Sequence, residues 1–380
     1  MMGAYPSAPR SRAALGLTAA AALGRFELQV CCDCGLVQYP PREACSRCLS
    51  IRLDWSAQGG RGELLSETRL AHSNHDFFRD RLPWRIGQVR LDSGPLVFVH
   101  VHGGVPAAPA RVRVRAHLDC VGQAALVAIP DQDVPHMRDD KQYSSFVCAP
   151  KQRKIVITDG TTAVGHALVR ALLAAGADRV WVGHTEREAE SARLKSIEGN
   201  ERVVLVPLDL TNPGSVADAA ESVGGEVDIL INSAEYAAGA YRAPPVERGE
   251  MDLYYFGLLR LAEAFAPLMR GRSQAHPGGL AWVNLLSVFA LTPAPAHATF
   301  SAAKAAAHSL ALSLRAQMMP AGIRVMNVFP APVDGADSVV KAIVQGLEQG
   351  LEDVYPGELA RELFLRWRQN PKVLERELAG

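Results

Sequence analysis

The stretch Lys154–Gly176, KIVITDGTTAVGHALVRALLAAG, predicts a strand, a tight turn and a helix in direct succession. Residues 154–158 are rich in β-branched side chains, and residues 164–176 carry apolar side chains at helical spacing. The turn between them contains Gly160 and Gly165. A glycine-containing turn at this point aims backbone N–H groups and the helix N-terminus at an anion such as a pyrophosphate. The stretch therefore predicts the start of a dinucleotide-binding fold.

Apolar strand-like runs alternate with helical runs from this stretch to the end of the chain. Such alternation predicts a parallel sheet covered by helices on both faces, which is a doubly wound α/β fold over residues 154–380. The further strand-like runs are RVWVG (179–183), VVLVP (203–207), DILIN (228–232), LAWVNLL (280–286) and IRVMNVF (323–329), with a shorter one at 353–355.

This domain resembles the short-chain dehydrogenase/reductase family, whose phosphate motif is TGxxxGxG. Thr158 and Gly165 match that motif, whereas Asp159 and Ala163 replace its first two glycines. The resemblance implies a Rossmann domain that binds NAD or NADP and forms a homo-oligomer through its own surface. The cofactor contacts that it implies come from Thr158, Gly160, Val164, Gly165, Asp209, Asn232, Lys304 and Pro330.

The choice between NAD and NADP depends on the residues after the second strand. His184 and Arg187 follow that strand and offer no clear acidic or basic selector. A positive residue there favours the 2′-phosphate of NADP, so NADP is slightly preferred.

The resemblance places the catalytic residues within Asn284–Lys304, NLLSVFALTPAPAHATFSAAK. The family uses a serine, a tyrosine thirteen residues later, and a lysine four residues after the tyrosine. Here Ser287 and Lys304 match, but Phe300 stands at the tyrosine position. A fourth family residue, an asparagine, falls at Tyr254. A phenyl ring has no proton to donate, and general acid–base catalysis contributes about 10²–10⁴ in rate. We therefore predict a degenerate active site, as in a pseudoenzyme.

Three outcomes remain open for this domain. In the first, the domain is an active dehydrogenase acting on acyl-CoA thioesters, and Tyr254 or His297 supplies the lost proton. In the second, the domain binds its cofactor without turnover. In the third, the fold serves only as a scaffold.

Cysteines ahead of this domain have the spacing of a metal site. Cys31 and Cys34 form one CxxC pair, and Cys45 and Cys48 form a second. Four thiolates at this spacing can close tetrahedrally on one Zn²⁺, which leaves no coordination position open for substrate. The cysteines predict a structural zinc ribbon within residues 1–50, after an N-terminal helix.

Residues 51–130 contain short alternating segments separated by glycine-rich turns, which predict a small antiparallel barrel. The run CCDCGLVQYPPREACSRC, then Trp55, then GGRGELLSET, resembles the zinc-ribbon and OB-fold family that accompanies thiolase-like enzymes. That resemblance implies a rubredoxin-like ribbon and an OB-fold that dock on a thiolase-like or aldolase subunit and help to hold an acyl-CoA thioester. The polar segment 131–153 is predicted to be an interdomain linker.

Composition narrows the classes of partner. The chain has 380 residues, 48% of them hydrophobic, and Lys plus Arg equals Asp plus Glu at 40 each. Because a nucleic-acid binder normally carries a basic excess, we expect no nucleic-acid partner. No apolar run is long enough to span a bilayer, so we expect no membrane insertion. Cysteines in metal-like spacing favour a reducing compartment, the cytoplasm.

Overall fold

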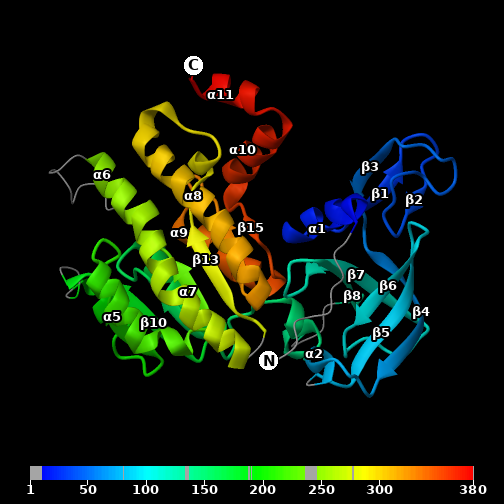
Figure 1. The fold of residues 1–380 in the computed structure, drawn as a ribbon, viewed down its shortest axis with the longest axis horizontal. Helices are drawn as coiled ribbons and strands as arrows, with labels where there is room; N and C mark the ends of the chain where they lie inside the picture. Colours follow the sequence, from blue (N-terminus) through cyan, green and yellow to red (C-terminus); the bar gives the residue numbers. More distant parts are fainter. Residues whose placement is uncertain are drawn as a thin grey trace. The chain divides into compact units, whose positions relative to one another are not determined.

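The computed structural model describes residues 11–379 apart from 80, 133–136, 187–188, 190, 236–245 and 276–277. The chain forms two compact units (Figure 1). The first runs to Cys148 and includes 320–322 and 348–351, and the second contains the remainder. Among the described helices, none is both long enough and apolar enough to cross a membrane.

A short helix and a three-stranded sheet form the ribbon. Helix α1 (Leu15–Ala22) buries Leu17 against the barrel core. The ribbon sheet has the strand order β2-β1-β3, from β1 (Glu27–Cys31), β2 (Val37–Gln38) and β3 (Leu53–Ala57). Strand β3 therefore completes the ribbon sheet, although the sequence boundary at residue 50 assigned it to the barrel.

The second half of the first unit is a closed barrel with the order β4-β5-β6-β8-β7. Strands β6 and β8 pair in parallel, and the other neighbours pair antiparallel. Alternate residues of β6 and of the first four residues of β4 are buried, which is the period-two pattern in the sequence. The OB-fold prediction is confirmed. The strands are β4 (Arg61–Leu70), β5 (Trp84–Leu91), β6 (Leu96–Val101), β7 (Ala110–Leu118) and β8 (Ala124–Pro130), and a short helix, α2 (Asp76–Arg79), lies between β4 and β5.

Part of the segment 131–153 packs on the barrel. Short 3₁₀ helices cover Met137–Asp139 and Tyr143–Phe146. Tyr143 packs edge-to-face on His102, and Phe146 lies 6.3 Å from Trp84 between ring centroids. The two aromatic side chains are buried, so this stretch adds core to the first unit although its sequence is mostly polar.

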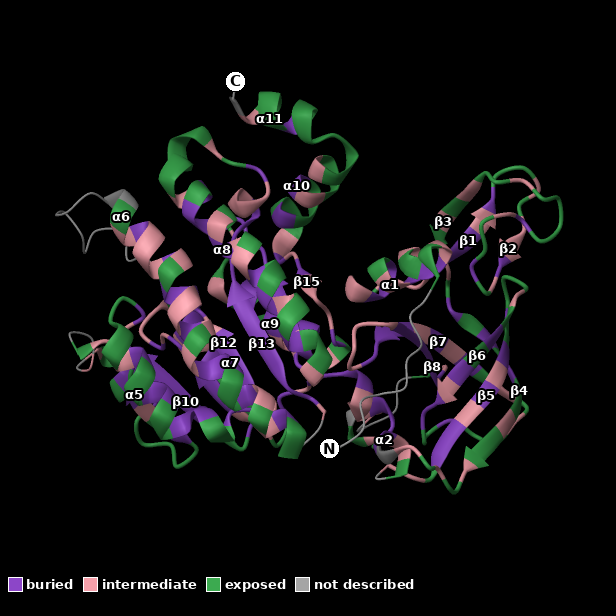
Figure 2. Cartoon of the chain, viewed as in Figure 1, coloured by how far each residue is buried: buried purple, intermediate pink, exposed green. Residues whose placement is uncertain are grey.

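The second unit is built on a seven-stranded parallel sheet with the order β11-β10-β9-β12-β13-β14-β15. Every residue of β13 is buried (Figure 2), as expected of a strand covered on both faces. The doubly wound α/β prediction is confirmed. The strands are β9 (Lys154–Ile157), β10 (Arg179–His184), β11 (Val203–Pro207), β12 (Ile229–Asn232), β13 (Ala281–Leu285), β14 (Arg324–Val328) and β15 (Asp353–Val354).

Helices connect these strands. Helices α5, α7 and α8 lie side by side in one layer, and α3 packs on β9 and β10 (Figure 1). A π-helical turn, Asp252–Phe256, joins α6 to α7. The helices are α3 (Ala163–Ala174), α4 (Ala192–Lys195), α5 (Pro213–Val223), α6 (Val246–Met251), α7 (Gly257–Ala275), α8 (Ala298–Met318), α9 (Ala336–Gln349), α10 (Gly357–Gln369) and α11 (Pro371–Ala379).

Candidate functional site

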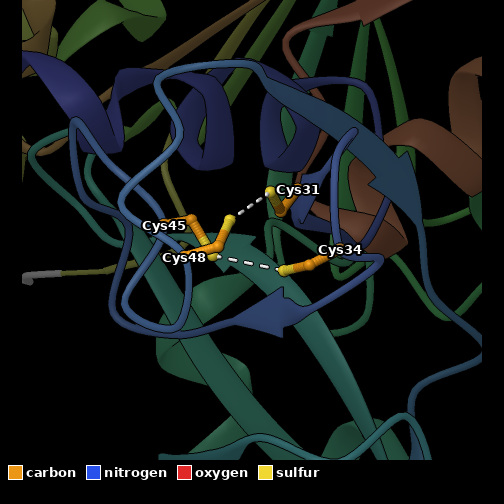
Figure 3. Close-up of side chains that lie close together, drawn as sticks. All are labelled: Cys31, Cys34, Cys45 and Cys48. Atoms are coloured by element: carbon orange, nitrogen blue, oxygen red, sulfur yellow. Dashed lines mark hydrogen bonds between the residues drawn. The ribbon is translucent and has the colours of Figure 1, made fainter.

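The four predicted metal ligands meet at one point of the ribbon. The sulfur atoms of Cys31, Cys34, Cys45 and Cys48 all lie within 4.8 Å of one another. Cys31 Sγ is 3.6 Å from Cys48 Sγ, and Cys34 Sγ is 3.6 Å from Cys45 Sγ (Figure 3). Tetrahedral Zn–S bonds of about 2.3 Å require sulfur–sulfur separations of about 3.8 Å. The cysteine cluster therefore fits a zinc ion.

Two similar turns present these sulfur atoms. Gly35 donates its N–H to the Cys31 carbonyl, and Leu49 donates to the Cys45 carbonyl. Both residues have positive φ, 69° for Gly35 and 63° for Leu49. Cys32 lies outside the cluster, and its thiol donates to the Asp54 carboxylate at 3.3 Å. Leu49 holds a backbone conformation that favours glycine, so the metal site has a strained second turn.

In the second unit, parallel strands bring distant segments to one edge of the sheet. The loops after β9, β12, β13 and β14 all leave from the carboxyl ends of adjacent strands. From β9 the next strands in the chain are added on one side of the sheet, and from β12 onward they are added on the other side. The switch point between β9 and β12 is the position where doubly wound folds bind ligands. The residues at or just after these carboxyl ends include Thr158, Asn232, Ser287 and Pro330.

The turn after β9 is closely packed. Thr162 caps α3 by accepting the Gly165 N–H at 3.0 Å. A Cβ atom at Gly165 would overlap the carbonyl oxygen of Asp159, and one at Gly160 would overlap Val182. Val164, the other predicted contact residue here, is buried at the start of α3. The glycines therefore allow a backbone cradle at the helix N-terminus, which fits a dinucleotide phosphate.

Replacing Gly165 with alanine tests this cradle. Because the new methyl group must displace the Asp159 backbone, we expect a loss of about 1–3 kcal/mol of stability, seen as a lower Tm in thermal unfolding. Gly271→Ala in α7 is the matched control, since nothing lies within 4 Å of a Cβ there. That control should be neutral or stabilise by up to about 1 kcal/mol. Equal Tm values for the two variants would contradict the close approach.

Two charged side chains, Asp159 and Arg193, lie at the turn. The Asp159 carboxylate accepts hydrogen bonds from the Thr161 N–H at 2.8 Å and from its hydroxyl at 2.7 Å, so one oxygen is turned toward its own loop. The exposed Arg193 of α4 donates to the Thr161 carbonyl at 2.9 Å. Arg193 places a cation beside the turn, and the sequence analysis did not identify it. A basic residue in the helix after the second strand is the pattern that would have indicated it.

The remaining predicted cofactor contacts occupy neighbouring loops. Asn232 Oδ1 accepts from the Thr158 hydroxyl at 3.3 Å, which ties the ends of β12 and β9 together. Asp209 Oδ1 is occupied by Thr211, through its N–H and its hydroxyl. The Pro330 carbonyl accepts from the Ser287 hydroxyl at 3.4 Å. Ser287 is 4% exposed and also caps a 3₁₀ turn by accepting from Phe289 N–H.

Lys304, Tyr254 and Phe300 form one group. Lys304 Nζ lies 3.8 Å from the ring centroid of Tyr254 and 5.6 Å from that of Phe300. The two rings meet edge-to-face with centroids 5.6 Å apart. Lys304 also donates to the Leu285 carbonyl at 3.0 Å. The lysine is therefore held by a carbonyl and by aromatic faces, and a phenyl ring stands at the position predicted for the catalytic phenol.

The electrostatic state of Lys304 reflects its burial. Lys304 is only 3% exposed, and desolvation lowers its pKa to about 8. The negative charges of Glu235 and Glu250 act in the other direction and raise this pKa. Partial desolvation and the nearby Asp159 raise the pKa of Glu235, whereas Lys304 lowers it. Lys304, Tyr254, Asn232 and Ala234 line a pocket of only about 10 Å³, enough for about one water molecule.

The other predicted candidates lie apart from this group. His297 is exposed, and its ring stacks on Phe289 with centroids 5.7 Å apart. His184 is buried at the end of β10, and its Nδ1 is 3.0 Å from the Thr185 carbonyl. Arg187 lies outside the described residues. Of the two alternative proton donors, Tyr254 is the one that contacts Lys304.

Family models match both units of the chain. The short chain dehydrogenase model matches residues 153–343, which is half of the chain. The rubredoxin-like zinc ribbon domain of ChsH2 matches residues 18–53, and the C-terminal OB-fold domain of ChsH2 matches residues 55–122. Both resemblances found in the sequence are confirmed, and the four clustered cysteines are those of a zinc ribbon.

Individual relatives match the second unit. The Dehydrogenase/reductase SDR family member 7B of Mus musculus is 30% identical over 212 residues, 52% of this chain and 63% of that protein. An uncharacterized oxidoreductase of Staphylococcus epidermidis is 28% identical over 192 residues, 48% of this chain and 79% of that protein. The chain thus spans less than two thirds of the mouse relative.

A solved structure resembles the same part of the chain. It is a short chain dehydrogenase from Burkholderia cenocepacia J2315 in complex with NADP, with a TM-score of 0.54 and 29% identity. The match covers 61% of this chain and 99% of that one. A relative with this fold therefore binds NADP.

Proposed function

Because this chain belongs to the short chain dehydrogenase family and carries ChsH2-type zinc ribbon and OB-fold domains, we propose that it is an accessory protein of acyl-CoA metabolism. In this proposal the ribbon and barrel dock on a thiolase-like or aldolase subunit and help to hold an acyl-CoA thioester. The dehydrogenase domain binds NADP or NAD, forms homo-oligomers and has a degenerate active site. The four zinc-binding thiolates of the ribbon favour a location in the reducing cytoplasm.

The proposal of a degenerate active site is supported by one observation, which is that a phenyl ring, that of Phe300, lies near Lys304. Carbonyl reduction by this family requires a proton on the substrate oxygen as the nicotinamide supplies hydride to the carbon. Phe300 cannot supply that proton, and Ser287 is engaged with the Pro330 carbonyl and the Phe289 N–H. The loss corresponds to about 10²–10⁴ in rate.

The cofactor would be held by this chain's own loops. The backbone around Gly160 and Gly165 would receive the phosphates at the N-terminus of α3, with Arg193 as the neighbouring cation. Lys304 and Asn232 would face the nicotinamide half, because they line the pocket at the ends of β12 and β13. Bound NADP or NAD would supply or accept hydride.

Calorimetry and affinity purification test the proposal together. We expect NADP or NAD to bind the full-length chain, and a thiolase-like or aldolase subunit to co-purify with it from its native cell. Reduction of β-ketoacyl thioesters and oxidation of β-hydroxyacyl thioesters should stay near background. Efficient turnover of either thioester would overturn the degenerate site, and purification without such a subunit would overturn the accessory role.

The second candidate is an active reductase of acyl-CoA thioesters in which Tyr254 donates the proton. The contact of Lys304 Nζ with the Tyr254 ring favours it, since it places a phenol-bearing side chain beside the lysine that matches the family pattern. In that case Tyr254→Phe should abolish turnover, while His297→Ala should leave turnover unchanged. Turnover that survives Tyr254→Phe would eliminate this candidate.

A further inference from the structure

Helix α4 is anchored against the glycine turn that follows β9. The buried Leu194 of α4 packs against that turn, since a Cβ atom at Gly160 would lie 3.4 Å from its Cδ2. The Ser196 hydroxyl donates to the Arg193 carbonyl at 2.7 Å, and its oxygen lies 2.9 Å from Nε2 of His166 on α3. Because these contacts tie α4 to the turn and to α3, the backbone of Arg193 is held beside the turn.

The Arg193 side chain reaches the turn itself. Its Nη1 donates to the Thr161 carbonyl at 2.9 Å, while the Asp159 carboxylate accepts from the Thr161 N–H at 2.8 Å. A carboxylate cannot donate to a phosphate, so side-chain donors for a phosphate have to come from other residues. A guanidinium carries five N–H groups, and the other nitrogens of Arg193 have no hydrogen-bond partner among the residues that the structure describes. The exposed Arg193 is therefore a cation at the turn with donors left for an anion.

Arg193 lies on the adenosine side of the expected dinucleotide site. In the sheet order, β10 and β12 flank β9 on opposite sides. Lys304 and Asn232 line the pocket at the ends of β12 and β13, where the nicotinamide half is proposed to lie. Gly160 packs on Val182 of β10, and α4 follows β10 in the chain. A dinucleotide that crosses the switch point places its two halves on opposite sides of β9, so its adenosine half approaches Arg193.

We propose that Arg193 is a specificity-determining residue, whose guanidinium binds the phosphate monoester on the adenosine ribose and makes the second unit prefer NADP to NAD. The proposal rests on the proposed function, in which this unit binds a nicotinamide dinucleotide. Arginine is suited to the role because its planar fork can bind two phosphate oxygens at once. The cation comes from α4 and not from the loop directly after β10, where the sequence offers His184 and Arg187.

An acidic residue near the same side of the sheet makes the opposite preference testable. Glu186 is exposed in the loop after β10, and a carboxylate there can accept from the free ribose hydroxyl of NAD. Within the described residues, Arg193 donates to the turn, whereas no hydrogen bond or ion pair joins the Glu186 side chain to it. The observations therefore favour NADP.

Isothermal titration calorimetry of the full-length chain with NADP and with NAD tests the proposal. Wild type should bind NADP at least about tenfold more tightly than NAD, and Arg193→Gln should raise the Kd for NADP by about 10–100-fold, because charge-assisted hydrogen bonds are lost. The Kd for NAD should stay within about twofold of the wild-type value. Equal losses for both dinucleotides would show that Arg193 only supports the turn and would overturn the proposal, as would an unchanged Kd for NADP.

Two variants control for that result. Arg202→Gln removes an exposed arginine that donates to the Ala177 carbonyl at 3.1 Å, beyond the C-terminal end of α3, so both Kd values should stay unchanged. Glu186→Gln should likewise leave the Kd for NAD unchanged, and a marked loss of NAD affinity would assign the selection to Glu186 and overturn the proposal. Because Arg193 is exposed, the preference for NADP should shrink in about 1 M NaCl, where the Debye length is about 3 Å.

Nucleotide fragments identify the phosphate and separate this inference from the proposed function. Adenosine 2′,5′-bisphosphate, the phosphorylated ribose fragment of NADP, should bind wild type at least about tenfold more tightly than AMP and lose that advantage in Arg193→Gln. Equal binding of the two, or tighter binding of adenosine 3′,5′-bisphosphate, the corresponding fragment of CoA, would overturn the assignment to NADP. If neither dinucleotide binds wild type, the cofactor function is refuted, and the fragments still decide whether Arg193 binds the ribose phosphate.

Discussion

Cys34→Ala should remove the metal and unfold the zinc ribbon. Metal analysis of the wild-type chain should give about one zinc per chain, and the variant should give close to none. Three thiolates cannot close the tetrahedron, and apparent binding free energies of structural zinc sites are about 10–16 kcal/mol. The ribbon sheet is small, since its strands have two to five residues, so the metal contributes much of its stability.

The neighbouring cysteine supplies the matched control for that prediction. Cys32→Ala changes an exposed thiol that bonds Asp54 and lies outside the sulfur cluster, so zinc content should remain near one. Tryptophan fluorescence, to which Trp55 on β3 contributes among the five tryptophans, should change in Cys34→Ala and stay as in wild type in Cys32→Ala. Full zinc occupancy in Cys34→Ala, or no zinc in freshly purified wild type, would refute the site.

Phe300→Tyr should create reductase activity. The substitution returns a phenol to the position next to Lys304, which lies 5.6 Å from the Phe300 ring centroid. Because the missing group is a general acid, we expect kcat/KM for carbonyl reduction with NADPH to rise by about 10²–10⁴. Phe300 is only partly buried, so the added hydroxyl should be tolerated.

A second substitution shows whether the gain comes from the phenol. Phe300→Leu should give no gain, and Phe300→Tyr combined with Lys304→Met should lose most of it, because the ammonium no longer lowers the phenol pKa. If Phe300→Tyr binds NADPH and folds normally yet gains nothing, the defect extends beyond the proton donor. Tyr254, which contacts both Phe300 and Lys304, would then be the next residue to replace with asparagine.

The fold was predictable because its strands are apolar runs with a clear period. The runs beginning at Lys154, Arg179 and Val203 became β9, β10 and β11, as the alternation of strands and helices requires. The cysteine spacing predicted a cluster because two knuckles can approach only one ion. Packing of Tyr143 and Phe146 on the barrel was not predictable, since their surrounding sequence is polar and has no period.

The sequence predicted which residues to compare with the family's site, but it did not predict their contacts. Sequence offsets identified Ser287, Phe300 and Lys304 because a fixed fold preserves those spacings. The approach of Lys304 to the Tyr254 ring depends on a π-helical turn, which the sequence does not indicate. Burial of Glu250 likewise depends on the packing of α6 against α8, which no local pattern encodes.

The π-helical turn Asp252–Phe256 also bears on how this site could have arisen. A π turn corresponds to one residue added within an α-helix, and each residue of an α-helix turns the chain by about 100°. The widened turn takes up that extra residue, so loss of a single codon within it would restore plain α-helix and change which side chain stands at the position of Tyr254. The contact of Tyr254 with Lys304 is then one deletion away from changing, so this part of the site can be altered in a single evolutionary step.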